Sequence, residues 1–184
     1  MKKTIFLSAV ALLMVGALSA QKFFTREGKI SFFSDAVVEK IEAHNNTATT
    51  VLDTETNRLE FAVLIKGFQF EKALMQEHFN ENYMESDQFP KASFKGQLTP
   101  DSQVNWKADG VYQVKVAGSL SIHGKTQQVT LPATFTIKSG AIQGSSSFQV
   151  AVADYGIEIP AVVRDNIAKE INIKVQANYQ IFNK

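Results

Sequence analysis

The most constraining feature of this sequence is a strict alternation of apolar and polar side chains over residues 111–138. Apolar or small residues occupy every second position on both sides of a short break at 123–125, where the sequence reads His-Gly-Lys. A period of two indicates antiparallel strands that bury one face, and the break predicts a hairpin turn. Pro132 lies on the polar phase and has no N–H to donate, so we expect a bulge or an unpaired site there.

Further strands are expected along most of the remaining chain. The segments with strand-like patterns are 23–34, 48–53, 58–68, 92–98, 103–107, 142–152 and 171–181. Residues 37–43 fit a strand or a helical turn, and the His-Asn-Asn sequence at 44–46 predicts a loop. About eight strands with tight turns favour an all-β antiparallel meander that hides its edges by closing into a barrel. Pairing of the first and last strands would close it, around packed side chains or one ligand.

One segment changes period. From Phe70 to Tyr83 the apolar residues follow three-and-four spacing, which predicts a single amphipathic helix inserted between strands. Its apolar stripe is compatible with a fixed cover over the barrel or with a lid that opens. The sequence leaves both alternatives open.

The first 20 residues have the pattern of a secretory signal peptide. Two lysines precede an apolar run over 5–18, and the small residues Ser19 and Ala20 follow. This order of charged, apolar and small residues predicts cleavage after Ala20, with a retained N-terminal anchor as the alternative. We therefore expect one β-barrel domain over 21–184, periplasmic or secreted, with no transmembrane segment in the mature chain.

Composition argues against several classes of function. Cleavage would remove Lys2 and Lys3 from 19 basic residues and none of the 18 acidic ones, which leaves a net charge of about −1. Without a basic stripe, nucleic acid is not expected as a partner. The chain has no cysteine, and its three histidines lack metal-ligand spacing, so no metal site is predicted. No catalytic constellation is present, so an enzyme acting on lipids is the least favoured interpretation.

The inward phases of the predicted strands define a candidate ligand site. Glycines at 96, 118 and 144 fall on these phases, where they either permit close coiling of the strands or leave a tunnel open. The predicted ligand-binding residues are Phe32, Phe61, Val63, Ile65, Leu74, Phe79, Phe94, Gly96, Val116, Gly118, Leu120, Phe135, Gly144, Phe148, Val150, Ile173 and Val175. Asp154 and Arg164 are the candidate head-group contacts, because they lie in or near one loop that we place at a barrel mouth.

Three stretches together resemble the YceI-like family of periplasmic lipid- or polyisoprenoid-binding proteins. They are residues 78–94, residues 120–132 (LSIHGKTQQVTLP) and the Asp-Tyr-Gly-Ile sequence at 154–157. The resemblance implies a lipocalin-like barrel that holds a long apolar chain. Two positions depart from the family pattern: Val152 stands where an Arg is frequent, and the first strand lacks the usual Phe-x-x-His ending.

The leading functional interpretation is a non-catalytic carrier of a polyisoprenoid, an isoprenoid quinone or a fatty acyl chain. No other cofactor is expected. The alternative is an exported interaction module whose barrel is filled by its own side chains, since the sequence contains fourteen Phe. A homodimer is one arrangement that the sequence leaves open.

Overall fold

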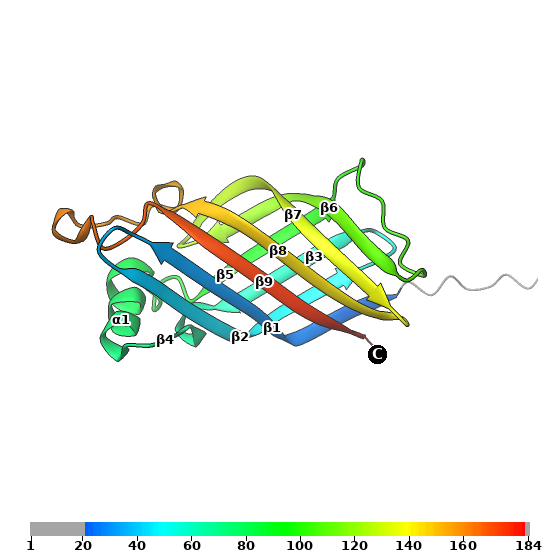
Figure 1. Ribbon diagram of the computed structural model, residues 1–184, viewed down its shortest axis with the longest axis horizontal. Helices are drawn as coiled ribbons and strands as arrows, with labels where there is room; N and C mark the ends of the chain where they lie inside the picture. Colours follow the sequence, from blue (N-terminus) through cyan, green and yellow to red (C-terminus); the bar gives the residue numbers. More distant parts are fainter. Residues whose placement is uncertain (1–20, 183–184) are drawn as a thin grey trace, which may run out of the picture.

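The computed structural model describes residues 21–182, and the predicted signal peptide lies outside them. Eight long antiparallel strands form the wall of one barrel (Figure 1). They are β1 (Lys22–Asp35), β2 (Lys40–Asp53), β3 (Arg58–Leu64), β5 (Lys91–Leu98), β6 (Gly110–Ile122), β7 (Lys125–Lys138), β8 (Ala141–Ala151) and β9 (Glu170–Ile181). β1 pairs with both β2 and β9, so the sheet closes on itself. The predicted fold, including pairing of the first and last strands, is confirmed.

The hairpin predicted from the alternation is the longest uninterrupted ladder among the described strands. β6 and β7 pair without interruption from Gly110 with Ile137 to Ile122 with Lys125. His123 and Gly124 make the turn with φ angles of 49° and 70°, a region that glycine adopts without strain.

The loop predicted at 44–46 is wrong, because these residues lie inside β2. Asn45 is buried, and its side chain bonds to backbone groups of its own strand and of β3. Its Oδ1 accepts the N–H of Thr47 at 2.8 Å, and its Nδ2 donates to the carbonyl of Leu64 at 3.1 Å. The register of β1 against β2 shifts on both sides of Gly28, so a bulge absorbs the polar residues without ending the strand.

The predicted helix is present but begins later and is irregular. Phe70 belongs to the short strand β4 (Gln69–Phe70), which pairs with β2. The helix α1 (Ala73–His78) continues into the π-helical turn η2 (Phe79–Tyr83). In the described part of the chain, no helix has the length and apolar character needed to cross a membrane. The strand predicted at 103–107 is also wrong, since these residues form a loop that ends in a turn.

Three short 3₁₀ segments complete the fold: η1 (Ile65–Gly67), η3 (Val152–Tyr155) and η4 (Ala161–Val163). η1 links β3 to β4. η3 and η4 lie in the connection from β8 to β9, at the same end of the barrel as α1 (Figure 1).

Side chains fill the end of the barrel opposite α1. Leu52, Phe135 and Ile142 are almost fully buried there, and the Trp106 ring lies edge-on to Phe135 with 5.0 Å between ring centroids. The Tyr179 hydroxyl lies 3.1 Å from Thr50 Oγ1 in the same cluster. This packed half resembles an ordinary protein core, so the interior near α1 is the part of the barrel left for a site.

Candidate functional site

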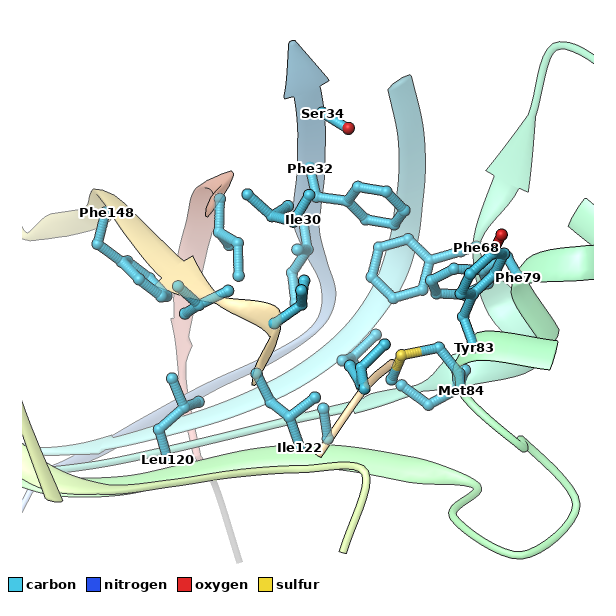
Figure 2. A pocket seen from close by; sticks show the side chains of 18 of the residues that line it. Ile30, Phe32, Ser34, Phe68, Phe79, Tyr83, Met84, Leu120, Ile122 and Phe148 are labelled. Atoms are coloured by element: carbon cyan, nitrogen blue, oxygen red, sulfur yellow. The ribbon is translucent and has the colours of Figure 1, made fainter. Parts of the chain in front are cut away.

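The half of the barrel nearest α1 is hollow and apolar. It encloses a cavity of about 360 Å³, and Figure 2 shows side chains from several strands and the helical segment pointing into it. Its lining residues are Ile30, Phe32, Ser34, Glu39, Ile41, Leu59, Phe61, Val63, Ile65, Phe68, Phe70, Met75, His78, Phe79, Tyr83, Met84, Ala92, Ser93, Phe94, Val116, Leu120, Ile122, Leu131, Pro132, Ala133, Ser146, Phe148, Val150, Val152, Ile157, Ile159, Val163, Asn166, Ile167, Ile171, Ile173 and Val175.

Four phenylalanine rings bind the helical segment to the barrel. Phe79 from η2 packs against Phe32, Phe68 and Phe70, with ring centroids between 5.0 and 5.7 Å apart. Phe32 lies in β1, Phe70 in β4, and Phe68 between η1 and β4. Figure 2 labels Phe32, Phe68 and Phe79. The helical segment therefore covers one side of the cavity through aromatic packing.

Several polar groups at the cavity already have partners or are kept neutral by burial. Glu39 forms an ion pair of 3.1 Å with Lys72, and Ser34 Oγ accepts the backbone N–H of Ala168 at 2.8 Å. Burial raises the pKa of Tyr83 above its ordinary value, which favours the neutral phenol. The surface offered to a ligand is consequently apolar, as is usual for sites that bind lipids.

Most of the predicted ligand-binding residues lie together at this cavity. Those that line it are Phe32, Phe61, Val63, Ile65, Phe79, Phe94, Val116, Leu120, Phe148, Val150, Ile173 and Val175. Leu74 does not line it, because its position on α1 leaves the residue 60% exposed. Phe135 belongs to the packed half and is only 1% exposed.

The three inward glycines do not line the cavity, which corrects the expectation of an open tunnel. A Cβ at Gly96 would strike the Phe94 ring, and one at Gly118 would strike the carbonyl of Lys95. A Cβ at Gly144 would lie 3.2 Å from the Phe135 ring. The glycines thus let strands and rings approach closely, the first of the two roles that the sequence left open.

The candidate head-group residues do not line the cavity. Asp154 is in η3, where its backbone carbonyl accepts a hydrogen bond from Gln127. Arg164 directly follows η4. No ion pair joins these two side chains within residues 21–182.

Sequence reasoning missed two kinds of residue at this end of the barrel. Ile30 and Ile122 line the cavity from strand phases that the alternation already identified as inward, so they could have been included. Ile157 and Ile167 lie in a connection without a period, where no sequence signal identifies them. His123 lies in the hairpin turn, where its side chain is 11% exposed and its Nε2 lies 2.8 Å from Glu85 Oε2.

The closed barrel and its apolar cavity place this chain among the small β-barrels that have room for one apolar ligand. The chain belongs to the YceI-like family, since the model of the YceI-like domain matches residues 20–179. This membership confirms the resemblance noted in the sequence. Among curated proteins, no match was found.

Solved structures with the same fold come from several bacteria. A polyisoprenoid binding domain from Saccharophagus degradans, implicated in plant cell wall breakdown, has 11% identity and a TM-score of 0.74 over 89% of this chain and 99% of its own. BcnA from Burkholderia cenocepacia has 16% identity and a TM-score of 0.68, with 83% and 96% covered. The YceI protein of Campylobacter jejuni has 16% identity and a TM-score of 0.51, with 98% and 99% covered. At these identities the similarity shows the fold alone.

Proposed function

We propose that this protein is a non-catalytic carrier that holds one long apolar lipid inside the barrel. The observation that carries the proposal is the hollow half, whose walls are made predominantly of aliphatic and aromatic side chains. Family membership supports it, as does the fold shared with a domain described as polyisoprenoid binding.

The energetics favour a chain-like cargo. Transfer of each methylene from water to an apolar site contributes roughly 0.8 kcal/mol, so a chain of modest length can bind without any charged contact. The cavity of about 360 Å³ lies in the range of ordinary ligand pockets, though near its lower end. Polyisoprenoids, isoprenoid quinones and fatty acyl chains all suit such a site.

The proposal extends to location. The pattern of residues 1–20 supports export by a cleaved signal peptide, so the carrier would act in the periplasm or after release. A lipid carrier is of use there because an apolar chain cannot cross an aqueous space by itself. Appearance of the mature protein, shortened by about 20 residues, in a periplasmic extract would support this location.

The first test is native mass spectrometry of the mature protein, purified without detergent, with organic extraction of the same sample. We expect a discrete adduct of a few hundred daltons that moves into the solvent. Ala92→Trp places a large ring at the cavity wall and should abolish the adduct. Ala117→Trp is the matched control, because Ala117 lies on the exposed outer face of β6.

The opposite result favours a different class of protein. The packed half shows that aromatic side chains already fill part of the barrel, which supports an interaction module as the second candidate. A bare polypeptide mass, unchanged after incubation with isoprenoid quinones and fatty acids, would contradict the carrier and favour this module.

A further inference from the structure

The barrel wall is incomplete between β7 and β8. Their ladder contains only the five pairs from Thr134 with Ser145 to Lys138 with Ala141, although both strands continue well beyond it. The ladder ends close to Pro132, which has no N–H to donate. Ser146 Oγ instead donates to the Pro132 carbonyl at 2.6 Å. We call the gap between residues 126–133 of β7 and 146–151 of β8 the window.

η3 lies across the far end of the window and is held there by two contacts. Gln127 Nε2 donates to the carbonyl of Asp154 at 2.7 Å. His123 Nδ1 lies 3.1 Å from the carbonyl of Tyr155, so a second contact ties η3 to the β6–β7 turn. The ladder, η3 and the two strand edges therefore frame the window on all sides, and Figure 1 shows β7 arching away from β8 over this stretch.

The window is hollow and adjoins the main cavity. It contains a second pocket of about 180 Å³. Three apolar side chains, Leu120, Leu131 and Val150, line both this pocket and the cavity. The two spaces therefore lie next to each other on either side of these three side chains.

The chemistry of the window differs from that of the cavity. Its polar lining consists of the amides of Gln127, Gln128 and Gln149 with Asp154 and Tyr155, and it includes no Lys or Arg. The backbone N–H and C=O groups that would have continued the ladder also face the gap. The Nε2 groups of the three amides already donate to the Asp154 carbonyl, Ser119 Oγ and Asn172 Oδ1. The amide oxygens and the backbone groups at the gap remain for an uncharged partner, whereas a phosphate would find a carboxylate and no Lys or Arg among the lining residues.

We propose that the window binds the polar head of the lipid, that this head is an uncharged hydroxyl or carbonyl group, and that the tail lies in the cavity. This inference rests on the proposed carrier function. It assigns the two pockets to the two ends of one molecule, with Leu120, Leu131 and Val150 at the junction.

The test compares three probes with the same branched chain: farnesol, its phosphate ester and the headless hydrocarbon farnesane. Hydrogen exchange is followed at the backbone amides of 128–131 and 149–151. Farnesol should slow exchange there, while farnesane should bind and leave these amides unchanged. Farnesyl phosphate should bind at least about tenfold more weakly than farnesol, the equivalent of roughly 1.4 kcal/mol.

Two variants of one strand give an independent readout. Ala151→Trp fills the window and should reduce the affinity advantage of farnesol over farnesane about tenfold, since the head group loses its hydrogen bonds. Ala141→Trp is the control, because Ala141 is exposed in the closed part of the ladder.

The outcomes separate this inference from the carrier function. Binding of both farnesol and farnesane without protection of the window amides would overturn the head-group site and leave the carrier intact. Equal affinity for farnesol and its phosphate would overturn the uncharged head. Failure of every probe to bind would contradict the carrier itself.

Discussion

At the scale of single residues, Gly118 shows how closely two strands of this barrel approach. It faces Gly96 across the β5–β6 ladder, and an added Cβ would meet backbone atoms of Lys95 and Gly96. Backbone atoms cannot turn aside as the end of a side chain can. A glycine at this position therefore lets the two strands approach closely enough for the barrel wall to curve.

Gly118→Ala should lower the free energy of unfolding by about 1–3 kcal/mol, because the two strands must separate to admit the methyl group. Binding per folded molecule should be unchanged, since Gly118 does not line the cavity. Urea unfolding and lipid titration measure the two quantities. Gly110→Ala is the control, where the new Cβ meets only the Tyr112 ring. A variant of normal stability that loses lipid would reinstate a tunnel at Gly118.

At the scale of elements, α1 and η2 act together as a cover that one ring holds in place. Phe79 contacts three other phenylalanine rings, whereas Leu74, one turn earlier in the helix, faces solvent. The aromatic attachment of the cover is therefore made by Phe79 of η2, and Leu74 of α1 takes no part in it.

Phe79→Ala should cost about 3 kcal/mol of stability, the lower end for a phenylalanine because the site is only half buried. It should also accelerate lipid release. Leu74→Ala should change stability by less than about 0.5 kcal/mol and leave release unchanged. Stopped-flow transfer of a fluorescent lipid to acceptor vesicles measures release. Equal release from both variants would indicate that the cover does not gate the cavity.

The same helix illustrates how far periodicity can predict an element. Three-and-four spacing identified the helix, and alternation identified Phe61, Val116 and Ile173 as inward residues that do line the cavity. Spacing could not reveal that Phe70 leaves the helix to pair with β2, because strand pairing depends on a distant partner. Asn45 was missed for the same reason, since its partner Leu64 is remote in sequence.

At the scale of the whole molecule, the barrel is packed at one end and hollow at the other. Thr50 and Tyr179 belong to β2 and β9, which are separated by β1 in the sheet, and their hydroxyl groups meet inside the packed half. Burial raises the pKa of Tyr179 to about 12, and the hydrogen bond from Thr50 offsets only part of this effect.

Stability should fall at high pH as a result. Because folding raises the pKa of this phenol, its contribution to the free energy of unfolding is complete below about pH 10. Roughly 2–3 kcal/mol of that free energy is lost as the pH rises from 10 to 12. Tyr179→Phe should lower the free energy of unfolding by about 1 kcal/mol at neutral pH and remove most of its dependence on pH. A smaller pH dependence should remain, because burial also raises the pKa values of Tyr155 and Tyr83. Urea midpoints at several pH values measure it, and equal slopes for both proteins would contradict the assignment.

Whether the barrel was hollow could not be predicted from the sequence. Phe135 and Phe148 occupy the same inward phase of their strands, yet Phe135 is enclosed by Trp106 and Tyr179 while Phe148 borders the cavity. Alternation reports which face a side chain takes. It does not report whether another side chain or empty space lies opposite, because that depends on residues far away in the chain.

The division of the interior into a packed and a hollow half also bears on how such a protein can change over time. A side chain that borders the cavity lacks neighbours on one side, so its exchange for another apolar residue of similar size disturbs less packing than an exchange of Leu52 or Ile142, which touch other residues on every side. A lineage can therefore exchange the residues of the hollow half to suit a new cargo without endangering the scaffold. A protein engineer who wishes to change the cargo can likewise substitute residues of the hollow half and should leave the packed half unchanged.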